Sequence, residues 1–134
     1  MDEAIKEQVR ERAAGRCEYC QLPDAHVLTS FQIEHVVAKH HRSGDELSNL
    51  AYACLRCNLH KGPNLAGIDP KTRKLTRLFN PRRHRWSRHF RWQGAILVGR
   101  SAVGRTTVDV LVINDPLRVA LRQELIDQGL FSTE

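Results

Sequence analysis

The spacing of apolar and polar residues predicts a helix near each end of the sequence. Residues 2–14 are charged on most faces and carry one apolar stripe, formed by Ala4, Ile5, Val9 and Ala13. Residues 116–128 begin with a proline, which is favoured in the first turn of a helix, and stop before Gly129. The side chains of this second helix expected to face the core are Leu117, Ala120, Leu121 and Leu125.

Short strands and one short helix are predicted downstream of the N-terminal helix. Residues 26–33 (HVLTSFQI) are rich in strand-forming side chains, and residues 50–53 (LAYA) form a second short run. A polar loop over residues 38–48 separates the two runs. A short helix is expected over residues 55–61, with Gly62 beyond its end.

The pattern becomes weaker in the second half of the chain. Residues 64–81 are expected to be loop-like because Gly and Pro turn signals interrupt them, and residues 91–98 are expected to form a strand. Residues 105–113 (RTTVDVLVI) fit a strand by composition, although a helix that begins near Ser101 fits equally well. These elements together predict an α+β protein.

Composition and charge narrow the range of partners. The 134 residues suit one domain with an appendage, and the formal charge of +6 with a pI of about 9.5 favours a polyanionic partner such as nucleic acid. An inert basic surface is the alternative that charge alone leaves open. No apolar run approaches the roughly 20 residues needed to span a bilayer, so no membrane partner is expected.

The N-terminal residues also bear on the cellular compartment. The sequence MDEAIKEQVRERAAGRC is charged throughout and lacks the apolar stretch of a signal peptide, so a cytoplasmic location is expected. Thiols stay reduced in the cytosol, and four cysteines there indicate a metal site before disulfides.

The cysteines form two CxxC pairs, separated by 33 residues: Cys17, Cys20, Cys54 and Cys57. Two such pairs are typical of a zinc ion held by four thiolates, which is a structural site because no position remains for water. Four metal-free buried thiols, or a redox-active pair, are the less favoured interpretations. The second pair lies at the start of the predicted helix 55–61, where the helix dipole favours thiolate.

Polar residues suited to hydrolysis lie between and after these pairs. Glu34 and His35 follow the first predicted strand, Asn49 precedes the second, and Asn58 and Lys61 follow the second CxxC. A histidine near neutral pKa can take a proton from water, and a divalent cation can stabilise a phosphate and its leaving oxygen.

The order of these residues resembles the HNH endonuclease family over about residues 16–62. The resemblance implies a small ββα-metal core stapled by a four-cysteine zinc site, with an N-terminal helix and a C-terminal extension. It also implies a metal-dependent DNA endonuclease, with Mg²⁺ or Mn²⁺, or alternatively Ni²⁺ or Zn²⁺, as the catalytic ion. The corresponding domain organisation is a nuclease module over residues 1–66 and a basic extension over 67–134, packed on the same domain.

Site roles follow from the resemblance. It implies that His35 is the general base, that Glu34 binds the catalytic cation and that Asn49 fixes the loop and orients the base. The helix ligand to the cation is expected to be Asn58, with His60 as the rival or as a phosphate contact. Residues 58 and 60 lie about 200° apart around a helix, so both cannot face the hairpin. Lys61 lies closer to the face of Asn58 and is expected to reach a DNA phosphate.

A basic segment with interleaved aromatic residues follows the motif. Residues 71–91 contain nine lysines or arginines and no acidic residue. Those expected to contact phosphate are Arg73, Lys74, Arg77, Arg82, Arg83, Arg85 and Arg88. The aromatic residues, which are expected to be core rather than groove contacts, are Phe79, Trp86, Phe90 and Trp92. His40 and His41 are expected to be solvated, with a substrate contact as the alternative.

Three functions therefore remain in view. A nuclease explains the charge, the cysteines and the set of Glu34, His35 and Asn58. A catalytically inactive, zinc-containing DNA-binding module explains the first two features. A protein-interaction adaptor explains none of the polar set. The oligomeric state does not follow from the sequence.

Overall fold

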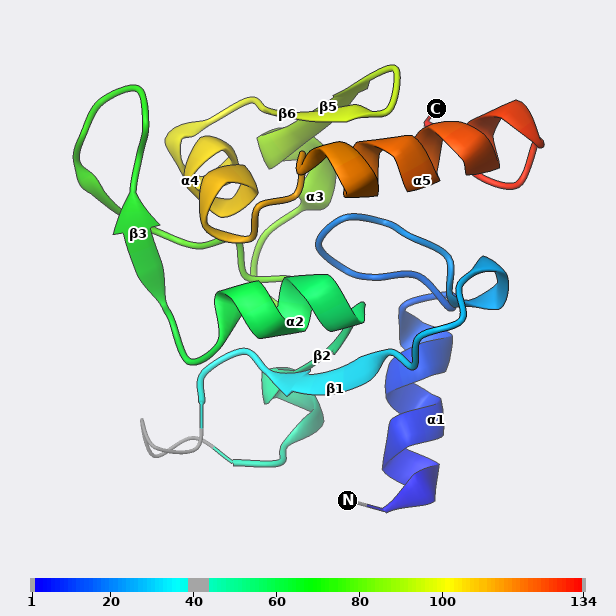
Figure 1. Cartoon of the computed structure of the whole chain (residues 1–134). Coiled ribbons are helices and arrows are strands. Elements are labelled where there is room, and N and C mark those ends of the chain that lie inside the picture. The colour runs from blue at the N-terminus through cyan, green and yellow to red at the C-terminus, as the bar shows by residue number, and fades with distance from the viewer. Residues whose placement is uncertain (1, 39–43, 134) are drawn as a thin grey trace.

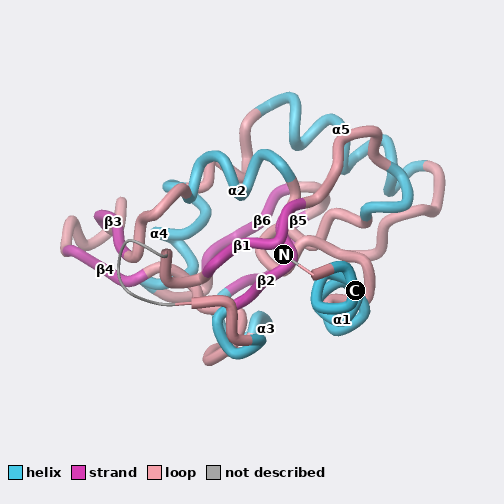
Figure 2. Tube along the Cα trace, turned by 90° about the horizontal axis from the view of Figure 1, so that it is seen from below, coloured by secondary structure: helices cyan, strands magenta, loops and turns pink. Residues whose placement is uncertain are grey.

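The computed structural model describes residues 2–38 and 44–133, and within them it combines five α-helices with three two-stranded antiparallel sheets (Figures 1 and 2). The sheets pair β1 with β2, β3 with β4 and β5 with β6. The elements in chain order are α1 (Glu3–Arg12), β1 (Gln32–His35), β2 (Leu50–Ala53), α2 (Leu55–Lys61), β3 (Ala66–Ile68), β4 (Leu75–Arg77), α3 (Trp86–His89), β5 (Phe90–Gln93), β6 (Ile96–Gly99), α4 (Ala102–Val110) and α5 (Pro116–Asp127).

The centre of the fold is the ββα unit formed by β1, β2 and α2. In the β1–β2 hairpin, Glu34 is opposite Ala51 and His35 is opposite Leu50. Helix α2 begins after Cys54, whose Sγ accepts the backbone N–H of Cys57, and it packs on β1. These elements, with an N-terminal helix and a C-terminal extension around them, confirm the predicted α+β fold of the ββα-metal type.

Helix α1 is held against β2 and the preceding turn. Val9 is fully buried and forms a small apolar cluster with Leu50 and Tyr52. Arg12 donates hydrogen bonds to the carbonyl oxygens of Leu47 and Leu50, at 2.9 and 2.5 Å. The predicted N-terminal helix is thus confirmed, and its charged residues fix the position of the hairpin as well as facing solvent.

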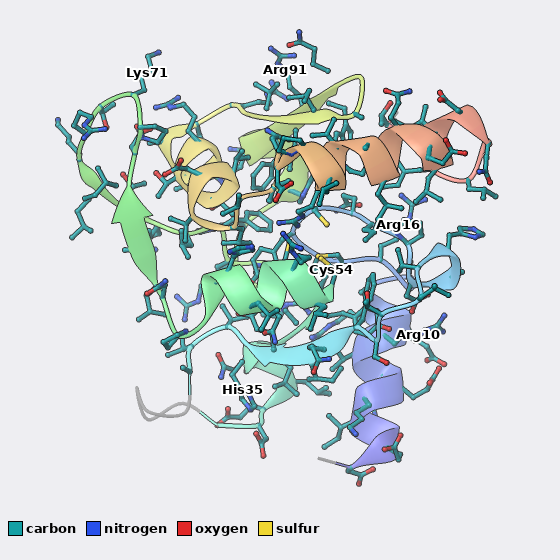
Figure 3. All side chains as sticks on the ribbon, in the orientation of Figure 1. Arg10, Arg16, His35, Cys54, Lys71 and Arg91 are labelled. Atoms are coloured by element: carbon teal, nitrogen blue, oxygen red, sulfur yellow. The ribbon has the colours of Figure 1, made fainter. Side chains whose placement is uncertain are left out.

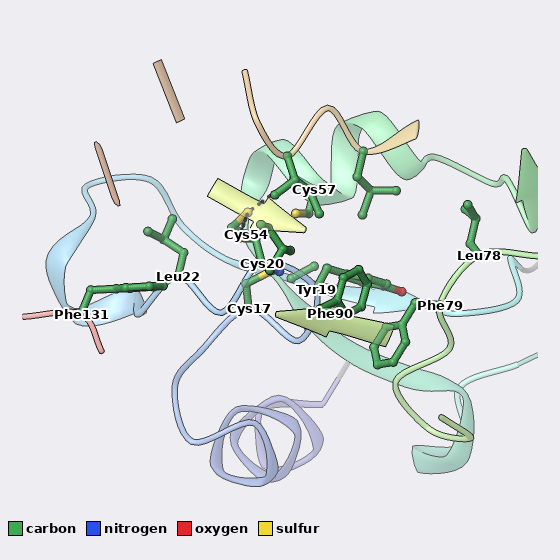
Figure 4. Close-up of a cluster of buried hydrophobic side chains, with 14 of the residues drawn as sticks. Cys17, Tyr19, Cys20, Leu22, Cys54, Cys57, Leu78, Phe79, Phe90 and Phe131 are labelled. Atoms are coloured by element: carbon green, nitrogen blue, oxygen red, sulfur yellow. Dashed lines mark hydrogen bonds between the residues drawn. The ribbon is translucent and has the colours of Figure 1, made fainter. Parts of the chain in front are cut away.

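One apolar core joins the ββα unit to the C-terminal extension (Figure 4). The two halves of the sequence contribute together to this core, and its members from the second half include Phe79, Phe90, Leu97, Leu111 and Phe131. Trp86 and Trp92 are partly buried against the same cluster, so all four aromatic residues of the basic segment serve the core, as predicted. The division at residue 66 remains a prediction.

Several predicted elements are corrected by the structure. The first strand covers residues 32–35 and not 26–33, because only the later residues pair with β2, while Leu28 is fully exposed. Residues 64–81, expected to be a loop, contain the β3–β4 hairpin. Residues 91–98 are not one strand, because Gly94 adopts a φ of 58° and turns the chain between β5 and β6.

The ambiguous segment 105–113 lies mostly in a helix. Ser101 caps α4 through a hydrogen bond from the Gly104 N–H to its Oγ, at 3.0 Å. This cap resolves the alternatives in favour of the helix that begins near Ser101.

The inward face of α5 also differs from the prediction. Leu125 is buried as expected, whereas Leu117 is 76% exposed and the side chains of Arg118 and Arg122 are buried instead. Arg122 donates to the carbonyl oxygens of Ala95 and Ile113, at 2.9 and 3.0 Å. The spacing of the leucines predicted the wrong inward face. The two arginines can be buried in their place because backbone carbonyl oxygens and a cysteine sulfur accept hydrogen bonds from their guanidinium groups. Among the described residues, no helix combines the length and the hydropathy that crossing a membrane requires.

We predict that Gly104→Ala destabilises the protein, although alanine is normally favoured over glycine in a helix by about 1 kcal/mol. A Cβ at this position would overlap the carbonyl oxygen of His89, which is backbone and cannot move aside alone. A loss of about 1–3 kcal/mol in the free energy of unfolding is expected, measured by urea denaturation. Asp109→Ala, at an exposed position of the same helix, is the control. Equal stability of the two variants would contradict the close packing.

Candidate active site and zinc centre

The four cysteines converge in one buried cluster. Their Sγ atoms all lie within 4.8 Å of one another, and the sulfurs of Cys20 and Cys54 are 3.7 Å apart. Four sulfurs placed tetrahedrally about 2.3 Å from zinc are separated by about 3.8 Å. The donor set and its spacing therefore fit a structural zinc ion, as the CxxC pairs predicted.

A buried arginine from α5 completes the surroundings of the thiols. Arg118 donates a hydrogen bond to Cys57 Sγ at 2.9 Å and lies 3.9 Å from Cys54 Sγ. Burial lowers the pKa of Arg118, but the charges of the cysteine thiolates outweigh it and the net shift is upward. A guanidinium in this place offsets the negative charge that four thiolates bring to one divalent ion. The amino-acid pattern gave no indication of this role for Arg118, because the leucines of α5 suggested a different inward face.

Glu34 is buried at the centre of the ββα unit, with 4% of its surface exposed. The Tyr19 hydroxyl donates to its Oε2 at 2.6 Å, and Lys61 Nζ lies 2.5 Å from its Oε1. Both carboxylate oxygens are thus engaged, Oε2 by the Tyr19 hydroxyl and Oε1 by the Lys61 ammonium. Burial raises the pKa of Glu34, and Lys61 and Tyr19 act in the opposite direction.

Lys61 is buried and does not reach the surface, where a phosphate contact was predicted. Its side chain is 2% exposed, and Nζ donates to the Val36 carbonyl oxygen at 3.0 Å in addition to pairing with Glu34. In this arrangement the ammonium faces the interior and not a DNA phosphate. The expected phosphate contact is therefore replaced by an internal ion pair that joins α2 to β1.

His35 is partly exposed, and its neighbour along the strand, Glu34, is buried, as the alternation of a strand requires. In Figure 3, His35 lies below β1, whereas Cys54 lies above it. The Nε2 atom of His35 is 2.6 Å from Oδ1 of Asp45. Asp45 was not among the predicted site residues, because the polar loop that carries it gave no indication of where it would fold.

Asn49 holds the segment that follows His35. Its Oδ1 accepts the Val37 N–H at 2.9 Å, and its Nδ2 donates to the carbonyl oxygens of Val37 and Gly44, at 2.9 and 3.0 Å. One amide side chain thus ties both ends of the 38–44 connection together. His40 and His41 lie in this connection but outside the described residues.

An open hollow of about 410 Å³ brings three of the predicted site residues together. Glu34, His35 and Asn58 line it, and its remaining lining is Ile33, Ala38, Gly62 and Pro63. His60, the rival of Asn58, is not part of this lining. Glu34, His35 and Asn58 therefore border one space that is open to solvent, while the carboxylate of Glu34 is buried against Tyr19 and Lys61.

The predicted phosphate-binding side chains divide into two groups. Arg82 is mostly buried and forms an ion pair with Glu18. It therefore joins the C-terminal extension to the first cysteine turn, residues 17–20. The exposed members are Arg73, Lys74, Arg77, Arg83, Arg85 and Arg88.

Comparisons with known proteins agree with this geometry. Residues 17–64 match the family model described as HNH endonuclease, which confirms the resemblance seen in the sequence. The chain is 28% identical over 131 residues to a Septu protein PtuB from Bacillus thuringiensis. That alignment covers 96% of the chain but 48% of the relative, so the chain spans about half of that protein's length. No solved structure matches the chain significantly.

We predict that Arg118→Met weakens zinc retention while leaving the fold in place. Removing a group that hydrogen-bonds a metal ligand typically lowers metal affinity 10–100-fold, and we expect about tenfold here. The measurement is zinc transfer to a chromogenic chelator under native conditions. Arg91→Met, at an exposed position of β5, is the matched control, and Cys17→Ser is the reference for a protein that fails to hold zinc and unfolds. Equal release from the Arg118 and Arg91 variants would show that the guanidinium does not protect the site.

Proposed function

We propose that the protein is a metal-dependent endonuclease that hydrolyses phosphodiester bonds in DNA. The observation that carries the proposal is the shared hollow of Glu34, His35 and Asn58, inside the segment that matches the HNH endonuclease family. The proposed organisation is a nuclease module over residues 1–66 and a basic extension over 67–134. The expected location is the cytoplasm, where the cysteines remain reduced.

His35 is proposed to act as the general base. The carboxylate of Asp45 contacts Nε2 of His35, which fixes the orientation of the ring and favours the tautomer that carries its proton on Nε2. In that tautomer Nδ1 can accept a proton from water. Asn49 supports this arrangement by holding the backbone next to the histidine. The proton of the attacking water would therefore pass to the imidazole.

Glu34 and Asn58 are proposed to hold the catalytic cation. Their oxygen atoms suit hard ions such as Mg²⁺ or Mn²⁺. When bound, such an ion would stabilise the charge that develops on the phosphate and the leaving oxygen. Lys61 already balances part of the charge on Glu34, so we expect the site to bind the ion weakly.

The second candidate is a zinc-containing DNA-binding module without catalysis. The observation that favours it is the engagement of Glu34 by both Tyr19 and Lys61, which is an arrangement a purely structural carboxylate also adopts. Both functions use the exposed arginines of the extension for phosphate contacts. They differ in whether His35 and Asn58 matter for strand cleavage.

We predict that His35→Ala abolishes cleavage of supercoiled plasmid in Mg²⁺ or Mn²⁺ while DNA affinity stays nearly unchanged. Losing a general base typically costs 10²–10⁴-fold in rate. Nicking is followed on agarose gels and affinity by fluorescence anisotropy. His26→Ala, at an exposed position outside the hollow, is the control. A wild-type protein that binds DNA but leaves it intact across metals would establish the second candidate.

We also predict that Asn58→Ala and His60→Ala differ. Only Asn58 lines the hollow, so its loss is expected to raise the Mg²⁺ or Mn²⁺ concentration needed for half-maximal cleavage at least tenfold. His60→Ala is expected to retain the wild-type metal dependence. The reverse result in a metal titration of plasmid nicking would assign the helix ligand to His60.

A further inference from the structure

The β3–β4 hairpin projects from one end of the molecule, beyond α4 and α2 (Figures 1 and 2). It lies outside the segment that matches the family model, in a part of the chain where the turn signals predicted only a loop. Its base is seated closely on α4, because a Cβ at Gly67 would lie against the side chains of Val110 and Thr106. The contact with α4 therefore fixes the orientation of the projecting hairpin.

The strand register gives the hairpin two distinct faces. Gly67 is paired with Thr76, and this pair is on the side that faces α4. Side chains alternate along a strand, so the next pair, Ile68 and Leu75, is on the opposite side. Ile68 is 47% exposed and Leu75 is 76% exposed. Two aliphatic side chains are thus presented side by side to solvent.

Positive charge surrounds this aliphatic pair. The exposed basic residues of the hairpin and its turn are Lys71, Arg73, Lys74 and Arg77. The hairpin's acidic residue, Asp69, is fully buried and accepts two hydrogen bonds from Arg105, at 3.0 and 2.9 Å. Its side chain also accepts the Lys71 N–H and the Thr72 hydroxyl, which fixes the turn. The projecting surface therefore combines apolar contact with uncompensated positive charge.

A second hollow, at the base of the hairpin, is next to the hollow that His35 lines, because residues adjacent in the chain line the two. Ala66 and Arg77, which form the first pair of the hairpin, line this second hollow of about 370 Å³. Val36 and Val37 line the same hollow, and they directly follow His35. A polyanion that reaches His35 can therefore extend over this second hollow towards the hairpin.

We infer that the β3–β4 hairpin is an arm that enters the major groove of double-stranded DNA, with Ile68 and Leu75 against base edges and the basic residues on phosphates. This inference rests on the proposed function and names how its substrate is held. The major groove, about 12 Å wide, admits a two-stranded ribbon, whereas the minor groove is about half as wide. The methyl group of thymine is the apolar feature that the major groove offers to aliphatic side chains.

The first test compares the double variant Ile68→Ser/Leu75→Ser with wild type in anisotropy titrations of a 30-base-pair duplex at several salt concentrations. Loss of the apolar contact is expected to weaken binding about tenfold without changing the slope of affinity against salt, because the phosphate contacts remain. Arg73→Gln/Lys74→Gln is expected to reduce that slope by about two. Leu28→Ser, at a fully exposed leucine away from the hairpin, is the matched control.

The second test replaces thymine by uracil in the same duplex, which removes the methyl groups and leaves the phosphates unchanged. Wild type is expected to bind the uracil duplex several-fold more weakly, and the Ile68→Ser/Leu75→Ser variant is expected to bind the two duplexes equally.

The outcomes separate the inference from the function on which it rests. A double variant with wild-type affinity, or a wild type that does not distinguish the two duplexes, overturns the inference while leaving a nuclease that still cuts plasmid. A wild-type protein that neither binds nor cuts duplex DNA overturns both.

Discussion

The convergence of four thiols is the constraint on which the structure depends. Cys17 and Cys20 come from the turn after α1, and Cys54 and Cys57 come from the start of α2. The partners of Glu34 are carried by these same two turns, since Tyr19 lies within the first and Lys61 ends the helix that the second begins. A metal at the cysteines therefore sets the position of the carboxylate at the candidate active site, although the two sites are distinct.

The C-terminal extension also contacts the two turns that carry the cysteines. Arg118 reaches the thiols, Arg82 pairs with Glu18 beside Cys17, and Trp86 donates a hydrogen bond to the Tyr19 carbonyl at 2.9 Å. Each of these contacts ends on the first or second cysteine turn. The extension thus packs against the two cysteine turns, while its β3–β4 hairpin projects away from them.

Local signals in the sequence were sufficient for much of the fold. The ends of α2 follow from Cys54 and Gly62, and the CxxC spacing predicted the sulfur cluster that the structure contains. The β3–β4 and β5–β6 hairpins were missed because their strands are only three or four residues long, and the run of strand-forming residues on both sides of Gly94 hid the turn between β5 and β6.

The site was predicted less completely than the fold. Motif residues Glu34, His35 and Asn58 do share a hollow, but the partners that determine their chemistry come from elsewhere in the sequence. Asp45 lies in a polar loop whose path is set by the Asn49 hydrogen bonds, and the burial of Lys61 depends on Glu34 facing inward. Contacts of this kind, between residues far apart in the sequence, leave no periodic pattern in the sequence from which they could be predicted.

The contact between Arg118 and Cys57 also bears on how the protein is made. These residues are separated by 61 positions, so a ribosome completes both cysteine pairs well before the shielding guanidinium leaves the exit tunnel. During that interval a loaded ion would be exposed to competing chelators and its thiolates to oxidants. We therefore expect the docking of α5, which brings Arg118 to Cys57, to slow the loss of a metal ion held by the four cysteines.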